Sequence, residues 1–454
     1  MIDQEGIFVK IKINLSQCMI VKNEEKNIRK ALTWGKNIVC EQIVVDTGSI
    51  DRTVEIAEEM GAKVFHFEWI DDFSAAKNFA IDQAKGNWIA FLDADEYFSE
   101  EDTKKILPLL AQVEEERRKL KIPLMVRSSL ANLDDEGRTS SIATQARLFS
   151  NVKNLRYDGR IHETLMIGGT KAPRAYEARD ILTVYHTGYT EKVYKETKKM
   201  DRNISILKKE VEKNKDNFEA WAYLGDSFLA NKQMKEAEEA YNYVVENMSF
   251  DLFQERRDFI FCNLLKIKYY SNNNDESVVL GVYQKSVEFA CLAPDAEYWV
   301  SLWMLDRGKL QQGIEYMELA LRRLELYDRD GNLDMAGSLP NVYGRLFEAC
   351  RALNRAQEAV RYGTLYLRME PYGESVLIEM IRLFKGGANG EEIAMAILSF
   401  LSKLYDLSRS KDKLFLIRIS RKLKFDELEK GVLNLLTQDE KEFLHENQSS
   451  ILGI

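Results

Sequence analysis

The chain has 454 residues, of which 45% are hydrophobic, and its formal net charge is −9 at pH 7. This length and composition supply hydrophobic cores for two or three ordinary globular domains. Lysine and arginine are mixed among a larger number of acidic residues, which excludes indiscriminate binding to nucleic acid. We therefore expect a folded protein without a nucleic-acid partner.

Cysteine usage and hydropathy indicate the compartment. The five cysteines are scattered and lack metal-ligand spacing, a pattern typical of reduced thiols in the cytoplasm. No apolar stretch approaches the roughly 18 residues of a membrane-spanning helix, and the first residues do not form a basic leader. The sequence predicts a cytoplasmic protein without membrane insertion.

From about residue 11 to residue 95, short β-branched runs alternate with helical stretches, which favours parallel strands joined by crossover helices. We expect strands at residues 13–21, 42–45, 63–67 and 88–92, and helices that include residues 51–60 and 73–85. Residues 123–190 are less regular and more β-like, and we expect them to complete the sheet. In such sheets the ligand crevice lies at the carboxyl ends of the strands.

After residue 190 the pattern becomes helical. Residues 218–248 match the tetratricopeptide pattern, and residues 340–371 give a second match. We predict an α/β domain at residues 1–195, tetratricopeptide-like repeats at 196–374 and further helices at 375–454. The last segment either caps the array or forms a homodimer interface. Aromatic residues of the helical half, such as Trp221 and Tyr223, are expected to pack between helices.

The triplet Asp93-Ala94-Asp95 directly follows the apolar run at residues 88–92. Alternate side chains of an extended segment point the same way, so both carboxylates can face one ligand. Carboxylate oxygens are the ligands that Mg²⁺ and Mn²⁺ prefer. A solvated turn or a helix cap is the alternative interpretation. We predict that the triplet binds a divalent cation and a diphosphate.

Other polar residues follow the expected strands. Asn23 and Glu24 come after the first strand, and Asp46 ends the second, where it can accept a hydrogen bond from a base N–H or a ribose hydroxyl. Lys77, on the helix before the acidic triplet, would add positive charge near the base or the phosphates. A solvated helix lysine is an equally good interpretation of that residue.

The β-like region carries a second group of candidates. Glu163 is the candidate general base for an acceptor, with His162 beside it as a further catalytic candidate. His186 would complete a metal shell or bind a phosphate, and Arg147 would clamp phosphate. Alternatively, the two histidines form hydrogen bonds with backbone groups and have no catalytic role, and Arg147 forms a structural ion pair.

Four motifs in order resemble glycosyltransferase family 2. They are Val-Lys-Asn-Glu-Glu at residues 21–25, Asp-Thr-Gly-Ser at 46–49, Phe-Ser-Ala-Ala-Lys-Asn at 73–78 and Phe-Leu-Asp-Ala-Asp-Glu at 91–96. The resemblance covers roughly the first 190 residues. It implies a GT-A fold, a nucleotide-sugar donor, a divalent metal such as Mg²⁺ or Mn²⁺, and inversion at the anomeric carbon.

Within that family, Gly-Arg-Ile-His-Glu at residues 159–163 and the segment at 184–189, followed by repeat helices, look like peptide glycosyltransferases of the sublancin S-glycosyltransferase type. By position, the resemblance implies that Asp46 contacts the uridine and that Asp93 and Asp95 contact the ribose and metal. It also places His186 on the metal or diphosphate and Glu163 at the acceptor. Lys77 departs from the pattern, because many relatives have arginine there.

These observations predict transfer of a hexose, of glucose or N-acetylglucosamine type, from a UDP-sugar to a peptide or protein. The acceptor atom would belong to cysteine, serine or threonine, and the helical repeats would hold the acceptor. Two alternatives stay open: a cell-envelope saccharide as the acceptor, and a non-catalytic scaffold built on the repeats. The intact acidic triplet argues against the scaffold.

Overall fold

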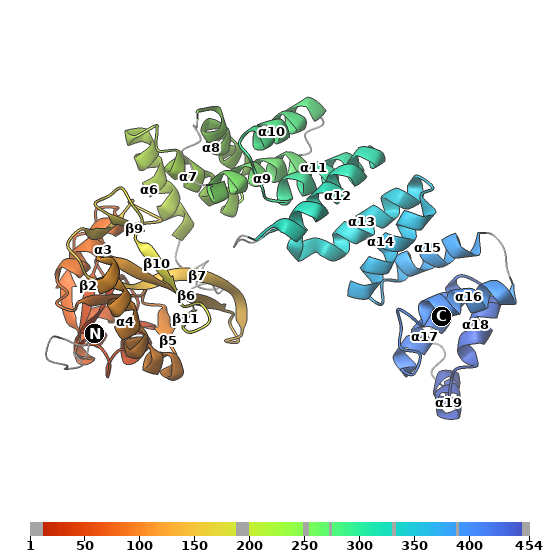
Figure 1. Cartoon of the computed structure of the whole chain (residues 1–454), viewed down its shortest axis with the longest axis horizontal. Coiled ribbons are helices and arrows are strands. Elements are labelled where there is room, and N and C mark those ends of the chain that lie inside the picture. Colours follow the sequence, from red (N-terminus) through yellow and green to blue (C-terminus); the bar gives the residue numbers. More distant parts are fainter. Residues whose placement is uncertain are drawn as a thin grey trace. The chain divides into compact units, whose positions relative to one another are not determined.

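The computed structural model describes residues 12–187, 199–247, 254–271, 275–328, 333–386 and 390–446. The chain divides into two compact units, Met1–Gln233 and Met234–Ile454 (Figure 1). The first unit contains a large sheet, whereas the described elements of the second are all helices. The domain limits expected at residues 195 and 374 stay predictions.

A nine-stranded mixed sheet forms the centre of the first unit. Its strand order is β3-β2-β1-β4-β7-β6-β11-β5, and β10 pairs with β6 beside this path. The strands are β1 (Leu15–Val21), β2 (Glu41–Asp46), β3 (Lys63–His66), β4 (Trp88–Phe91), β5 (Glu96–Phe98), β6 (Leu124–Leu133), β7 (Thr139–Ser150), β10 (Arg174–Glu177) and β11 (Thr183–His186). The first four strands along this order are parallel, so their carboxyl ends meet at one edge.

The expected order of strands and helices up to residue 92 is confirmed. The crossover helices are α1 (Ile28–Thr33), α2 (Thr53–Glu59) and α3 (Phe73–Asp82). Helix α3 ends three residues before the expected residue 85, and Gly86 lies beyond it, next to β1. A long helix that the pattern did not predict, α4 (Glu100–Leu120), follows β5.

Strand β4 is buried on both faces, as its uninterrupted apolar sequence indicates. Trp88, Ala90 and Leu92 pack with α4, whereas Ile89 and Phe91 pack with α3. The two helices therefore cover opposite faces of the sheet at β4. This packing fixes the point where the strand ends and the acidic triplet begins.

Further elements complete the first unit. A two-stranded antiparallel ribbon, β8 (Leu155–Asp158) and β9 (Thr164–Ile167), contacts α3 through β8. Helices α6 (Lys199–Lys213) and α7 (Phe218–Ala230) also belong to this unit and pack on each other. Helix α6 buries Ile204, Leu207 and Val211.

The second unit is a tetratricopeptide-like helical region, in which α11 packs against α12 and α13 against α14. Its helices are α8 (Met234–Asn247), α9 (Gln254–Tyr270), α10 (Glu276–Glu288), α11 (Asp295–Asp306), α12 (Leu310–Leu326), α13 (Leu339–Ala352), α14 (Ala356–Met369), α15 (Glu374–Lys385), α16 (Glu391–Leu401), α17 (Ser410–Lys422), α18 (Asp426–Leu433) and α19 (Gln438–Glu446). None of the helices in the described residues has the length and apolarity needed to cross a membrane.

The approach of β4 to β1 depends on Gly86. A Cβ atom there would lie 2.5 Å from the backbone oxygen of Asn14 and 2.8 Å from the backbone nitrogen of Ser16. We predict that Gly86→Ala lowers the stability of the first unit by about 1–3 kcal/mol, because the backbone of β1 must shift. Calorimetric unfolding of the full chain measures this as a lower transition temperature for that unit.

Gly281→Ala is the matched control, because Gly281 lies in α10 with open space around its Cβ position. That substitution should leave stability unchanged or raise it by up to about 1 kcal/mol, since alanine favours helix. Equal unfolding profiles for the two variants would contradict the role given to Gly86.

Candidate active site

A cavity of about 590 Å³ opens at the carboxyl ends of β1, β2 and β4. Its walls come from these strand ends, from α3, from β7, from the loop between β8 and β9, and from α6 and α7. All of these elements belong to the first unit. The cavity therefore lies where the strand order predicted a ligand crevice.

Seven of the ten predicted site residues line this cavity: Glu24, Lys77, Asp93, Asp95, Arg147, His162 and Glu163. The other three, Asn23, Asp46 and His186, do not line it. His186 is nevertheless tied to Asp95, and Asp46 is followed directly by Thr47, which does line the wall.

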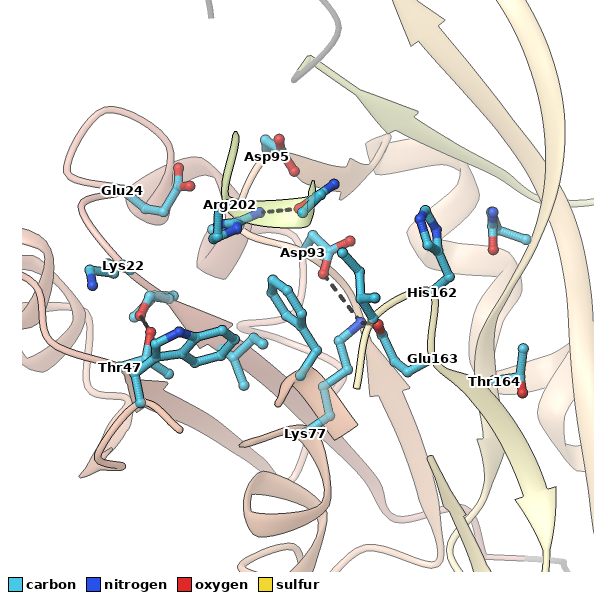
Figure 2. Close-up of a pocket in the computed structure, with 18 of the residues that line it drawn as sticks. Lys22, Glu24, Thr47, Lys77, Asp93, Asp95, His162, Glu163, Thr164 and Arg202 are labelled. Carbon is cyan, nitrogen blue, oxygen red and sulfur yellow. Dashed lines mark hydrogen bonds and ion pairs between the residues drawn. The ribbon is translucent and has the colours of Figure 1, made fainter. Parts of the chain in front are cut away.

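Lys77 joins the acidic triplet to the candidate base. Its Nζ atom lies 2.5 Å from Glu163 Oε1 and 3.6 Å from Asp93 Oδ1, and its side chain is only 4% exposed. Figure 2 shows Lys77 reaching between these two carboxylates. Burial alone would lower the pKa of Lys77, but Asp93 and Glu163 outweigh it and raise that pKa above its ordinary value. The interpretation of Lys77 as a solvated helix lysine is therefore wrong.

Arg147 forms a second buried link on the other side of Asp93. Its Nη2 atom lies 3.0 Å from Asp93 Oδ2 and 2.5 Å from Glu96 Oε1. Burial raises the pKa of Glu96, and Arg147 opposes this rise. The backbone N–H of Asp93 also donates to Glu96 Oε2 at 3.1 Å. The carboxylate of Asp93 is thus held from both sides.

Asp95 and His186 form a pair suited to a cation. Asp95 Oδ2 lies 3.4 Å from His186 Nε2, and both side chains are 12% exposed. His186 Nδ1 lies 2.8 Å from the amide oxygen of Asn132, an acceptor that favours a proton on Nδ1 and leaves Nε2 for coordination. Burial lowers the pKa of His186, but the carboxylates of Asp95, Glu96 and Asp93 together raise that pKa above its ordinary value.

These two side chains fit a Mg²⁺ or Mn²⁺ ion that takes its other ligands from a substrate. Over the described part of the chain, no group of three or more His, Cys, Asp or Glu residues is arranged around one metal position. Mg²⁺ commonly binds through one or two protein ligands together with phosphate oxygens and water. The donor set therefore fits a metal–diphosphate complex better than a closed structural metal site.

Asp46 and Asn23 hold the turns at the strand ends. Asp46 accepts hydrogen bonds from the backbone N–H groups of Gly48 at 3.2 Å and Ser49 at 3.0 Å. Asn23, which has a positive φ of 57°, accepts from the N–H of Ile50 and donates its own N–H to Ser49. These bonds join the loops after β1 and β2, so both residues shape the crevice through its backbone.

The cavity wall contributed by α6 and α7 was not predicted. The ring of His162 stacks on Tyr223, with centroids 3.9 Å apart and planes inclined by 14°. Tyr223 was expected to pack between helices, but its ring contacts the loop between β8 and β9 instead of lying wholly in a helical core. His162 has a φ of 54°, an uncommon conformation that the surrounding structure maintains. Arg202 and Asn203 of α6 line the same side.

An aromatic wall faces the ends of β1 and β2. Trp69 and Phe73 both line the cavity, and their rings pack edge to face at 4.8 Å. Phe73 belongs to a motif quoted above, but Trp69 lies between two such motifs and carried no signal in one sequence. The residues Gly188 and Tyr189, which contributed to the predicted resemblance, lie outside the described residues.

Comparisons with known proteins agree with this geometry. Residues 16–154 match the family model described as Glycosyl transferase family 2. A TPR repeat-containing protein of Synechococcus elongatus is 38% identical over 149 residues, which cover 33% of this chain and 34% of that protein. The SPbeta prophage-derived glycosyltransferase SunS of Bacillus subtilis is 28% identical over 256 residues, covering 54% of this chain and 57% of that protein.

An uncharacterized glycosyltransferase of Rickettsia bellii is 41% identical over 103 residues, which cover 23% of this chain and 35% of that protein. The chain thus spans between 34% and 57% of the length of these relatives. The matched residues include β1, β2 and β4 together with the acidic triplet. Residues 16–154 therefore form a glycosyltransferase family 2 domain, in a GT-A fold that tetratricopeptide-like helices follow.

Proposed function

We propose that the protein is a metal-dependent inverting glycosyltransferase that moves a hexose from a UDP-sugar to a cysteine, serine or threonine of a peptide or protein. The observation that carries this proposal is the cavity at the strand ends, where Asp93 and Asp95 lie together with the Lys77–Glu163 pair. The family match of residues 16–154 supports the same chemistry.

The donor would occupy the side of the cavity formed by β1, β2 and β4. Trp69 and Thr47 offer an aromatic face and a polar edge for a nucleobase, and Asp93 offers an acceptor for the ribose hydroxyls. Arg147 and Lys77 already neutralise Asp93, so this carboxylate is fixed before the donor arrives. We assign the uracil and ribose to this side for these reasons.

Asp95 and His186 would hold the divalent ion next to the diphosphate. The ion, when bound, offsets the negative charge that develops on the diphosphate as it leaves. Asn132 fixes the ring of His186, and the N–H and hydroxyl groups of Thr187 bond to the backbone oxygen of Asp95. These bonds orient the two side chains and limit their movement.

Glu163 would accept the proton of the acceptor. A carboxylate oxygen takes the proton of the S–H or O–H group, the sulfur or oxygen bonds to the anomeric carbon, and the bond from that carbon to the diphosphate breaks. UDP leaves with the bonding electrons. Lys77 remains protonated, because its pKa is raised by the carboxylates around it, and its ammonium holds the carboxylate of Glu163 in place.

The acceptor would enter along the wall made by His162, Tyr223 and Arg202. The parallel stack of His162 and Tyr223 lines the same cavity as Glu163. Arg202 lies with its guanidinium carbon 5.0 Å from the ring centre of Phe73. This wall combines aromatic surface with a positive charge, which suits a polypeptide better than a bare hydrophobic ligand.

Metal dependence is tested through Asp95. We predict that hydrolysis of a UDP-hexose by the full chain requires Mn²⁺ or Mg²⁺ and that Asp95→Ala lowers the rate by about 100-fold or more. The release of UDP with and without Mn²⁺ measures this. Asp180→Ala, on an exposed residue outside the cavity, is the matched control and should keep the wild-type rate. A metal-independent rate, or full activity of Asp95→Ala, would contradict the proposal that the protein is a metal-dependent glycosyltransferase.

The role of Glu163 gives a separate prediction. Glu163→Gln should lower transfer by about 100-fold or more while the affinity for the UDP-sugar changes by less than about threefold, because the proposed proton transfer involves only the acceptor. Product formation by mass spectrometry and donor binding by calorimetry measure the two quantities. The exposed Glu58→Gln is the control. Loss of donor binding in Glu163→Gln would show that Glu163 belongs to the donor side.

A further inference from the structure

Strand β7 is much longer than the part of it that pairs with β4. Only Leu148, Phe149 and Ser150 of β7 have partners in β4, namely Ala90, Ile89 and Trp88. On its other side β7 pairs with β6 from Thr139 onwards. Within the described residues, no strand pairs with residues 139–144 on the side where β4 lies.

The position beside residues 139–144 is left open because the chain turns away after β4. Continued beyond Ala90, the register of β4 and β7 places Phe91 to Asp93 opposite residues 145–147. The turn then closes through a bond from the N–H of Glu96 to the oxygen of Asp93 at 3.0 Å, and the next strand, β5, pairs with β11 at the end of the sheet. The open position therefore begins beyond Asp93. Gln145 and Arg147, which directly follow the free edge, line the cavity.

The free edge lacks the features that usually protect edge strands. Residues 139–143 are exposed along successive positions, and Ile142 is 70% exposed. Strand β7 contains neither lysine nor proline, and most of its exposed side chains are serine, threonine or alanine. Natural edge strands commonly carry lysine or proline, or are covered, because open backbone groups recruit other chains. An edge of this kind beside a cavity favours binding of an extended segment.

We propose that residues 139–144 of β7 bind an extended segment of the acceptor polypeptide as an added strand, in line with β4. The inference rests on the function proposed above and specifies how the acceptor is held. A segment paired there would run towards Asp93, whose carboxylate shares Lys77 with the candidate base Glu163. The open edge spans roughly 20 Å, enough for a segment of about six residues.

This mode of binding implies broad acceptor sequence tolerance. Main-chain hydrogen bonds would supply most of the affinity, and the small side chains of β7 would discriminate little between acceptor residues. Selection would then fall on the residue that reaches Glu163 and on its nearest neighbours. The acceptor must also be locally unfolded, since a residue already in a helix or sheet cannot pair with the edge.

The test uses the wild-type full chain, a UDP-hexose with Mn²⁺, and a mixture of ten-residue peptides that carry one central cysteine, serine or threonine. The best acceptor is then resynthesised in two series. One series carries N-methyl groups on the odd-numbered backbone amides and the other on the even-numbered ones, and neither carries a methyl group next to the acceptor residue. Only alternate N–H groups of a strand face the neighbouring edge. We expect one series to lose about tenfold or more in kcat/KM and the other to stay within about twofold.

Equal losses in the two series, or no loss in either, would overturn the proposal. Hydrolysis of the UDP-hexose without transfer to any peptide would also overturn it, while leaving the donor chemistry intact. Hydrogen exchange supplies an independent readout: the best acceptor should slow exchange in residues 139–144. If exchange in these residues instead slows with increasing protein concentration, whether or not the peptide is present, the edge pairs with a second copy of the chain. That result would overturn the proposed pairing with the acceptor.

Discussion

The buried ammonium of Lys77, shared by Glu163 and Asp93, is the interaction on which the arrangement of the site depends. A charge that is only 4% exposed is stable only when opposite charges compensate it. The rings of Phe91 and Tyr157 lie 5.2 and 5.1 Å from Nζ and add favourable contacts. Lys77 therefore joins three segments: helix α3, the end of β4 and the loop between β8 and β9. In the proposed reaction it fixes the donor side and the acceptor side relative to each other.

Arg147 extends this arrangement along β7. It links Asp93 to Glu96. The buried cations Lys77 and Arg147 therefore form one connected network with three carboxyl groups, those of Asp93, Glu96 and Glu163. Asp95 pairs with His186. The two aspartates of the triplet thus have different surroundings: Asp93 is neutralised by protein cations, whereas Asp95 lies beside a histidine that suits metal coordination. This difference supports the proposed division between ribose binding and metal binding.

The sequence predicted those parts of the site that depend on local pattern. Parallel strands with apolar sequences end at one edge, so polar residues after these strands were expected together. Glu24, Asp93 and Asp95 do line one cavity, whereas Asn23 and Asp46 hold the loops behind it. Contacts between distant segments were not predictable from one sequence. Tyr223 reaches His162 only because α6 and α7 pack within the first unit, and the positive φ of His162 has no sequence signal. The open edge of β7 depends on where the neighbouring strands end. The periodicity of apolar residues in a sequence gives such strand ends only to within two or three residues.

The most direct measurement of the central claim is peptide transfer by Lys77→Met compared with Lys77→Arg. Methionine retains much of the side-chain volume but removes the charge, and the loss of one partner from a buried ion pair costs about 3–5 kcal/mol. The account predicts that Lys77→Met lowers kcat/KM by about 100-fold or more, while Lys77→Arg, which keeps a cation between Asp93 and Glu163, retains considerably more activity. Transfer by Lys77→Met at the wild-type rate would contradict the claim that this ammonium organises the site.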